Sequence, residues 1–456
     1  TAKNNNGKKK VLASVLAGLA VAGAMGGIAP LEAQAGYDTG NSHVNIWADT
    51  APDGSNGKNN AGQNSIVVGY QNKTDNVGGN DGKVAIGAAN SASGNSAMAM
   101  GNMNVANGGA ATSIGAGNEA TAATTLAVGN KNNANAENAI AIGSYNNQNW
   151  TAGSWQTTPK KAGAYSTTVG QYSDALGNFA VAVGYMNESK VQDTVTMGQF
   201  NKAKTMGGIS IGKNNLTDST NGGRNFAATA DENSQIAIGR DNEATHLDTI
   251  AIGRETKASG SGATVVGARA EASGNNSIAI GQSGKDSPKV IASGVNSIAI
   301  GMQSQATGES AIAEGPGSRA AGQFGVALGR KANASATAAT ALGNEATANI
   351  ANGVALGSSS VTTTDKGVVG YNPSDPHERK YAPLTGNVKT ATTAAVSIGN
   401  GQQMTRQLTG LAAGTADTDA VNVAQLKNVG VAVTGNTGSS DFLTDGGKLN
   451  VRGEGR

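Results

Sequence analysis

The chain has 456 residues, of which 67 are glycine and only 4% are aromatic, so the thick apolar cores of ordinary globular domains are not expected. The formal net charge is +2 and no basic face is evident, which argues against nucleic acid as a partner. The chain contains no cysteine, which excludes disulfide bonds and thiolate metal sites.

Residues 1–35 have the pattern of a signal peptide. Three lysines at positions 8–10 precede an apolar run over 11–28, Pro30 ends that run, and Ala33-Gln34-Ala35 supplies a cleavage site. A transmembrane helix is the alternative, since the run lies near the lower length limit for a span. Its four glycines and the Ala-x-Ala site favour cleavage. We predict a signal peptide over 1–35 and an N-terminal lead segment over 36–60.

From residue 66 onwards one short phrase recurs: a large apolar residue, a small one, a large apolar one and a glycine. Ile278-Ala279-Ile280-Gly281 is one copy, and long stretches repeat it every 14 residues. A fixed period predicts a stack of identical units, here a head over residues 61–370. The glycines that end the phrase in the 14-residue series are Gly87, Gly101, Gly115, Gly129, Gly143, Gly170, Gly184, Gly198, Gly212, Gly239, Gly253, Gly267, Gly281, Gly301, Gly315, Gly329, Gly343 and Gly357.

Each phrase is predicted to form a strand. Side chains alternate along a strand, so Ile278 and Ile280 share one face and Ala279 points to the other. A small residue stands two before most phrase glycines, as at Ala85, and another stands five after, as at Ala92. We expect these small residues to let a second strand layer approach closely. The alternative is that they simply face solvent.

Two recurring residue types are predicted to make the turns. Asn often stands three after the phrase glycine, as at Asn104, and a Gly follows many second strands, as at Gly108. Both types tolerate positive φ, so the chain is expected to reverse there twice per repeat. Successive coils would then pair as parallel strands about 4.8 Å apart. So narrow a coil buries little apolar surface, which predicts side-by-side association of chains.

Three interruptions of the period are the candidate binding loops. Gly143 to Gly170 and Gly212 to Gly239 each span 27 residues, and Gly281 to Gly301 spans 20. Insertions into a solenoid usually leave the stack as loops. The first insertion is preferred because it holds two of the three tryptophans; spacers or flaps over a trimer are the alternatives. The candidate ligand contacts are Tyr145, Trp150, Trp155, Arg224, Phe226, Lys285 and Lys289.

Residues 406–426 (RQLTGLAAGTADTDAVNVAQL) closely resemble the neck of the trimeric autotransporter adhesins, and the 14-residue phrase resembles their YadA-like head repeat. Head and neck together cover about residues 61–430, in the family's order. The resemblance implies an all-β solenoid, a left-handed parallel β-roll, with three chains per head and a neck that leads into a coiled-coil stalk. It also implies a place on the outer-membrane surface of a diderm bacterium. Nothing here resembles the family's C-terminal membrane anchor, so a passenger segment is expected.

The neck is expected over residues 401–430. Thr418 or Asp419 can cap a helix from residue 420 to 429, which is too short to be stable alone. Val423 and Leu426 have the spacing of a coiled-coil seam that partner helices would cover. Before the neck, residues 371–400 read as a proline-containing insert with a last roll strand; after it, 431–456 begin a further strand-rich or stalk segment. Candidates for pairing between chains, unless they are solvated surface charges, are Arg406, Asp417 and Asp419.

Enzymatic chemistry is not predicted. The three histidines, His43, His246 and His377, stand at unrelated positions, and no metal-ligand spacing, Walker loop or catalytic triad is present. We therefore expect no cofactor. The sequence favours an adhesin head that binds a matrix protein, a host-cell receptor or another bacterium. A structural spacer without a specific ligand is the alternative, and an array that binds ice or carbohydrate is a weaker one.

Glu314 departs from the phrase. Every other phrase glycine in the series follows an aliphatic residue or methionine, whereas Gly315 follows this carboxylate. An ionised carboxylate among apolar neighbours is costly unless it is paired. Either Arg319 pairs with it, or the coil locally turns it to water, and Pro316 favours the second.

Overall fold

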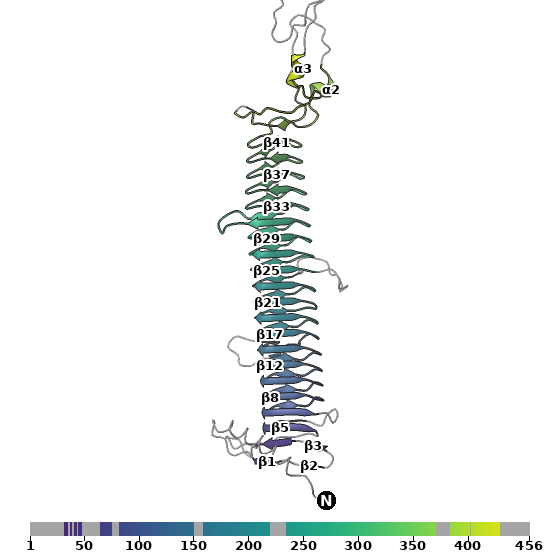
Figure 1. Ribbon diagram of the computed structural model, residues 1–456, viewed down its shortest axis with the longest axis vertical. Coiled ribbons are helices and arrows are strands. Elements are labelled where there is room, and N and C mark those ends of the chain that lie inside the picture. The colour runs from purple at the N-terminus through teal and green to yellow at the C-terminus, as the bar shows by residue number, and fades with distance from the viewer. Residues whose placement is uncertain are drawn as a thin grey trace, which may run out of the picture. The chain divides into compact units, whose positions relative to one another are not determined.

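A computed structural model describes residues 32–34, 37–38, 41–42, 44–47, 64–74, 82–149, 158–218, 234–370, 384–401 and 403–428, with the backbone alone up to residue 47. The chain forms two compact units, residues 1–296 and 297–456. Strands dominate the described parts of both (Figure 1). None of the helices in the described residues has the length and apolar character needed to cross a membrane.

In unit 1 each phrase forms a long strand, and consecutive long strands pair parallel with glycine opposite glycine, as for Gly115 and Gly129. The pairing begins with β4 (Val44–Trp47), which is antiparallel to β1 (Glu32–Gln34) and parallel to β5. Nearby, β2 (Tyr37–Asp38) and β3 (Asn41–Ser42) form an antiparallel pair. The long strands are β5 (Ser65–Tyr70), β6 (Lys83–Ala88), β8 (Met98–Asn102), β10 (Thr112–Ala116), β12 (Leu126–Asn130), β14 (Ile140–Ser144), β17 (Thr167–Gln171), β19 (Val181–Tyr185), β21 (Val195–Gln199), β23 (Ile209–Lys213), β25 (Ile236–Arg240), β27 (Ile250–Arg254), β29 (Thr264–Ala268) and β31 (Ile278–Gln282).

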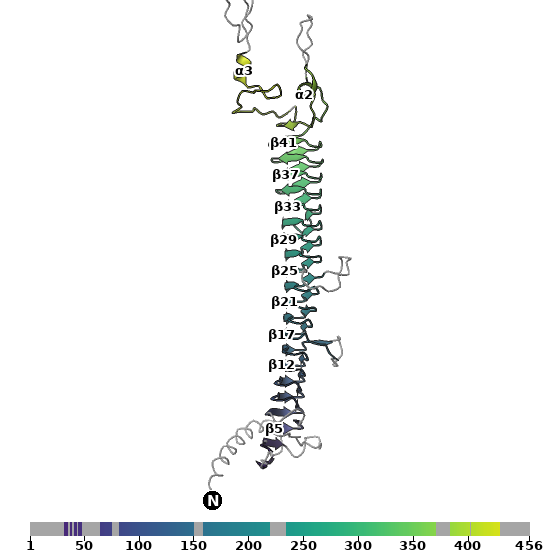
Figure 2. The ribbon, with the colours of Figure 1, turned by 90° about the vertical axis from the view of Figure 1, so that its right-hand side faces the viewer.

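Short strands form the second layer of unit 1, on the opposite side of the stack from the long strands (Figure 2). They also pair in parallel, but their ladder breaks at the first insertion, where β15 (Gln148–Asn149) and β16 (Thr158–Pro159) form an antiparallel hairpin instead. The short strands are β7 (Ser91–Ala92), β9 (Val105–Ala106), β11 (Glu119–Ala120), β13 (Asn133–Ala134), β18 (Asp174–Ala175), β20 (Glu188–Ser189), β22 (Lys202–Ala203), β24 (Leu216–Thr217), β26 (Glu243–Ala244), β28 (Lys257–Ala258), β30 (Ala270–Ala272) and β32 (Val290–Ala292).

Unit 2 repeats this coil with shorter long strands and adds the neck. Its only helices in the described residues are α2 (Gly386–Lys389) and α3 (Val423–Lys427). The strand β42 (Val396–Ser397) pairs parallel with β41, so the roll resumes after the insert. The strands are β33 (Ile298–Ile300), β34 (Gln305–Ala306), β35 (Ile312–Glu314), β36 (Arg319–Ala320), β37 (Val326–Leu328), β38 (Asn333–Ala334), β39 (Thr340–Leu342), β40 (Thr347–Ala348), β41 (Val354–Leu356) and β42.

The core between the two layers consists mainly of alanine. Ala85 and Ala99 from long strands, and Ala92 and Ala106 from short strands, are all 0% exposed. Small side chains let the layers close onto each other with no room for a larger core. The predicted two-strand coil with parallel pairing is confirmed, and the alternative that the small residues face solvent is wrong.

The turn mechanism predicted from the sequence is wrong. Neither Asn104 nor Gly108 has positive φ. Gly108 is needed instead because a Cβ there would lie 1.7 Å from the carbonyl oxygen of Ala122 in the next coil. Apart from the phrase glycine itself, positive φ occurs two residues after it, as at Met103 (55°), and nine residues after it, as at Ala110 (55°).

These two turns define the two edges of the coil. We call the two residues directly after a phrase glycine the first edge. We call the three residues that lie five to seven positions before the next phrase glycine the second edge. For the coil of Gly170, the first edge is residues 171–172 and the second edge is 177–179.

The recurring asparagines form a buried ladder along unit 1. Asn118 donates from Nδ2 to Ile114 O (3.0 Å) and Gly129 O (2.7 Å) and also contacts Asn104 Oδ1 (3.0 Å). Its own Oδ1 accepts from the backbone N of Asn132 (2.9 Å). The ladder residues are Asn72, Asn90, Asn104, Asn118, Asn132, Asn146, Ser173, Asn187, Asn201, Asn215, Asn242 and Thr256.

Unit 2 has Ser or Ala in place of the ladder asparagine, and its turn differs. The backbone N of Ala332 donates to Gly329 O (3.2 Å), three residues before it, and Ser318 does the same to Gly315 O (3.1 Å). The long strands of this unit accordingly end before the glycine, as β35 does at Glu314. Asparagine at this position occurs only with the first geometry, whereas Ser and Ala occur with either, because Ser173 and Ala270 of unit 1 follow long strands that run through the glycine.

Glu314 keeps the strand register, opposite Ile300 and Leu328. Its side chain is exposed, and among the described residues it forms no ion pair with Arg319. The carboxylate therefore reaches water in the single chain without the local distortion that Pro316 led us to expect.

Candidate ligand and assembly surfaces

The first insertion leaves the stack through the hairpin β15–β16. Gln148 and Asn149 pair with Pro159 and Thr158, so the ends of the insertion are held together at the short-strand layer. Trp150 and Trp155 lie outside the described residues. Their neighbour Tyr145 belongs to the first edge rather than to the loop, and its ring stacks on Tyr172 at a centroid distance of 5.2 Å.

The base of this hairpin is fixed by buried polar groups. Asn147 Nδ2 donates to Asn133 O (2.9 Å), and Asn147 Oδ1 accepts from the backbone N of Ala175 (2.9 Å). Lys160 forms an ion pair with Asp174. Burial raises the pKa of Asp174, against the opposing effect of the lysine. The insertion therefore joins unit 1 through a stem that is held in place by buried polar contacts.

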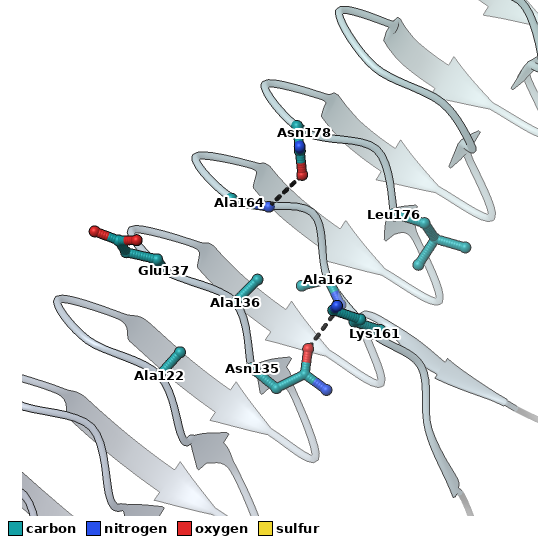
Figure 3. Close-up of a pocket in the computed structure, with 9 residues that line it drawn as sticks. All are labelled: Ala122, Asn135, Ala136, Glu137, Lys161, Ala162, Ala164, Leu176 and Asn178. Atoms are coloured by element: carbon teal, nitrogen blue, oxygen red, sulfur yellow. Dashed lines mark hydrogen bonds between the residues drawn. The ribbon is translucent and has the colours of Figure 1, made fainter. Parts of the chain in front are cut away.

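A groove of about 420 Å³ lies beside this stem (Figure 3). Asn135 Oδ1 accepts from the backbone N of Ala162 (2.7 Å), and Asn178 Oδ1 accepts from that of Ala164 (3.0 Å). The groove runs where the ladder of short strands is interrupted, and the exposed Glu137 and Lys161 also line it. Its lining is mostly polar and small, which provides no deep apolar pocket for a small ligand.

The other predicted loop contacts are spread along the chain. Arg224 and Phe226 lie outside the described residues. Lys285 and Lys289 are exposed on the loop between β31 and β32, and Lys289 Nζ lies 3.3 Å from Glu271 Oε2. The described residues therefore do not bring the predicted contacts together into one site. No group of three or more potential metal-ligating side chains was found among them.

The outer face of the long strands carries two columns of mostly apolar side chains, with Thr112, Thr167, Thr264, Thr340 and Glu314 as the polar exceptions. The columns are the residues one and three positions before each phrase glycine, and in every coil they are at best half-buried. In unit 1, Ile280 is 38% exposed and Met197 is 41% exposed. In unit 2, Leu342 is 42% exposed. A long, largely apolar surface of this kind usually marks an interaction surface.

In the neck, Arg406 binds the end of the roll. Its guanidinium donates to Ser360 Oγ (2.9 Å), Ile398 O (2.5 Å) and Ser358 O (2.6 Å). It also lies over Gly357, where a Cβ would be 3.0 Å from Arg406 Cζ. Within one chain, Arg406 thus ties the neck to the last coils rather than remaining a solvated charge.

The helix prediction for the neck needs correction. The helix α3 has five residues rather than ten, and its N-cap is Asn422, not Thr418 or Asp419. Asn422 and Gln425 form a capping box, and Gln425 also bonds both backbone groups of Gly414. Val423 (67% exposed) and Leu426 (66%) are uncovered in the single chain, and their predicted seam stays a prediction.

Asp419 instead closes the turn before the helix. Its Oδ2 accepts from the backbone N of Ala416 (3.0 Å) and of Thr415 (2.9 Å). These bonds, the one from Ala416 most of all, lower the pKa of Asp419 below its usual value. Asp417 receives no hydrogen bond from the described neck residues, and its predicted pairing between chains stays a prediction.

Asp419→Ala should destabilise the neck at pH 7, because the carboxylate that holds residues 415–416 is removed. A lowered folded-state pKa adds stability that is present above the unfolded-state value, near 3.8, and is lost as the pH falls below it. The difference in Tm between variant and parent should therefore shrink from pH 7 to pH 3. Asp417→Ala is the matched control, and an equal loss in both variants would refute the assignment.

Both the roll and the neck match family models of known proteins. Residues 84–102, 120–146, 258–283, 292–318, 320–346 and 334–360 match the YadA head domain repeat, and residues 407–447 match the coiled stalk of trimeric autotransporter adhesin. Autotransporter adhesin BadA of Bartonella henselae is 38% identical over 100 residues, which is 20% of this chain and 3% of that protein. Trimeric autotransporter adhesin AtaA of Acinetobacter sp. (strain Tol 5) is 42% identical over 93 residues, 20% of this chain and 2% of that protein. The matched part is a very small share of either relative.

Proposed function

This chain belongs to the YadA-like trimeric autotransporter adhesins, and from that premise we propose that it forms the head and neck of a homotrimer on the surface of a diderm bacterium. The trimer would attach the cell to a matrix protein, a host-cell receptor or another bacterium. The family is one of adhesins, which favours a structural and adhesive protein over an enzyme.

The observation that best supports the assembly is the pair of mostly apolar columns on the long strands. A folded chain that leaves Ile280 and Met197, at equivalent positions of two coils, about two-fifths exposed would aggregate or self-associate in water. Three copies that turn this face toward a common axis would bury most of its apolar area. The alanine core between the layers is too thin to supply that burial within one chain.

Attachment would be multivalent. Each binding loop would occur three times around the axis, so that weak single contacts combine into a high overall affinity. The first insertion is the preferred contact because its two tryptophans are large apolar groups in a chain poor in aromatic residues. Its rigid stem at Asn147 and Asp174 would present the loop at a fixed place on the rod.

Replacing Trp150 and Trp155 together with alanine should reduce retention of the trimer on its target by at least tenfold, with little change in Tm. The measurement is a binding screen of the purified head against matrix proteins, host cells and bacterial cells, followed by titration of the variant on any target retained. Lys190→Ala, at an exposed position of the roll outside every candidate loop, is the control.

Two outcomes would count against this assignment. Lost stability with unchanged binding would mean that the tryptophans pack on the rod. A stable trimer that retains no target in the screen would favour the alternative function, a spacer without a specific ligand.

A further inference from the structure

The two edges of unit 1 carry bulky residues where the backbone disfavours them. Tyr145, Tyr172 and Phe200 of the first edge, and Tyr165 and Phe179 of the second, all have φ between 53° and 58°. This left-handed region suits glycine or asparagine and is costly for an aromatic residue. The turn imposes the same φ on other residue types in other coils, as at Met103 and Ala110, so the cost of a bulky side chain there is one that a further contact would offset.

The aromatic rings of the two edges occur in the same coils. On the first edge, Tyr145, Tyr172, Tyr185 and Phe200 form a row with ring-centroid distances of 5.2, 6.1 and 5.5 Å. On the second edge, Tyr165 stacks on Phe179 at 5.1 Å, with exposed fractions of 52% and 53%. Both groups belong to the coils that contain β14 to β21.

The charges of the two edges are complementary in sign. In the described part of unit 1, the first edge holds Lys131, Lys213, Arg240, Arg254 and Arg269 against Asp241 and Glu255. The second edge there holds the acids Glu137, Asp193 and Asp248, and His246 is its one basic side chain. Unit 2, taken alone, shows the same signs, with Arg330, Lys331 and Glu345 on its first edge and Glu309 on its second.

Some of the first-edge charges form ion pairs with each other, whereas the second-edge acids do not. Arg269 Nε lies 2.7 Å from Glu255 Oε2, and Arg240 Nε lies 3.3 Å from Asp241 Oδ2. No ion pair among the described residues involves Glu137, Asp193 or Asp248. The first edge retains a net positive charge after its own pairs are formed, so it remains attractive to an acidic surface.

Cyclic symmetry brings unlike edges together. If three copies turn their long-strand faces to one axis, each copy forms one side of a triangle, with its first edge at one corner and its second edge at the other. Rotation about the axis then places the first edge of each copy against the second edge of the next. If the axis is parallel to the direction of stacking, rotation about it also keeps each coil at its own height. Equivalent coils of neighbouring copies therefore meet.

We propose that these corners are specific seams, in which the first edge of one protomer binds the second edge of its neighbour. The aromatic row from Tyr145 to Phe200 packs against Tyr165 and Phe179 of the next copy. Lys131 faces Glu137 and Arg240 faces Asp248, since each of these pairs belongs to one coil. The occupant of each edge is thus a second copy of this chain, and the inference rests on the trimer proposed above.

Cysteine cross-linking tests the seam directly, because the chain has no cysteine of its own. Tyr172 and Phe179 lie on opposite edges of one coil with β18 between them, so they should join only between copies. The double variant Tyr172→Cys with Phe179→Cys should give a covalent trimer on a non-reducing gel after oxidation. Each single variant should stay monomeric on that gel, and so should Tyr172→Cys with Ser261→Cys, whose positions lie in different coils.

Light scattering on the reduced proteins separates the two proposals. A trimer in solution without the selective cross-link would overturn the seam and leave the trimer intact. Dimers from a single variant would show that like edges meet, which also overturns it. A folded monomer at micromolar concentration would reject the trimer and the seam together.

A charge exchange gives an independent readout that retains the aromatic rings. Lys131→Glu and Glu137→Lys should each lower the Tm of the trimer by a few degrees, and the two together should restore most of the loss. Restoration cannot come from within one chain, because the two residues lie on opposite edges and the contact of Lys131 with the Tyr145 ring (5.5 Å) stays lost. Additive losses in the double variant would overturn the seam.

Discussion

Gly115→Ala should abolish cooperative folding of unit 1. The glycine has a φ of 125°, and a Cβ on it would lie 1.9 Å from the carbonyl oxygen of Gly129 in the next coil. The obstacle is backbone rather than a flexible side chain, so two paired strands would have to separate. We expect a loss of more than about 4 kcal/mol, the range reserved for changes that break the fold locally.

The loss should spread beyond one coil, because a stack of repeats is stabilised by contacts between neighbours. Thermal unfolding followed by circular dichroism, together with limited proteolysis, would detect it. Gly109→Ala is the matched control for packing within the chain: no atom of the same chain lies within 4 Å of a Cβ at this glycine, and no positive φ is required there. A Gly115 variant that melts within a degree or two of the parent would show that adjacent coils are less closely packed than described.

Asn118→Ala is expected to have the next largest effect. The substitution removes the amide that bonds Ile114 O, Gly129 O and Asn104 Oδ1, and it leaves these buried acceptors short of donors. It also removes the acceptor for the backbone N of Asn132. Unsatisfied buried groups of this number should lower the free energy of unfolding by about 2–4 kcal/mol per chain.

The loss of stability will be smaller if the variant can adopt the second turn geometry, which needs no asparagine. Ala332 and Ala346 occupy the same place in unit 2 and donate from their backbone N to the glycine three residues before. If the Asn118 variant adopts this turn, its loss of Tm will fall at the small end of the range. Thr121→Ala, at an exposed position of the same coil that lies on neither edge, should leave the Tm unchanged. An equal effect in both variants would contradict a structural role for the ladder.

Much of the fold followed from the sequence because the repeat carries two independent signals. Alternation along Ile278-Ala279-Ile280 gave the faces of the strand, and the 14-residue spacing gave the pairing of equivalent residues in successive coils. Both are properties of a regular stack, and the structure confirms them. Handedness and the number of chains came from the family resemblance alone.

The roles of Asn104 and Gly108 could not be separated by spacing. A recurring Gly indicates either positive φ or a close approach, and a recurring Asn indicates either a turn or a buried amide. The spacing of these residues is the same for either role, whereas the structure shows a close approach at Gly108 and a buried amide at Asn104. The positive-φ positions went unnoticed because residues such as Met103 and Tyr172 give no turn signal.

The neck helix was misplaced although its signal was present. Asn422-x-x-Gln425 is a capping-box pattern that competes with Thr418 and Asp419, and the structure uses it. Among the predicted ligand contacts, Tyr145 was grouped with the insertion because of its place in the sequence. Its ring belongs to the edge row, which only stacking in space reveals.

The asparagine ladder also has a mechanical consequence. A pull along the direction of stacking loads the hydrogen bonds between coils lengthwise, and the coils of unit 1 then act as links in series that all carry the same force. The weakest link decides where such a rod opens. Side-chain amides reinforce most links, but at Ser173 a single hydroxyl replaces one amide, and beyond Thr256 the reinforcement ends. The force needed to separate two coils of unit 1 therefore depends on one side chain in each coil.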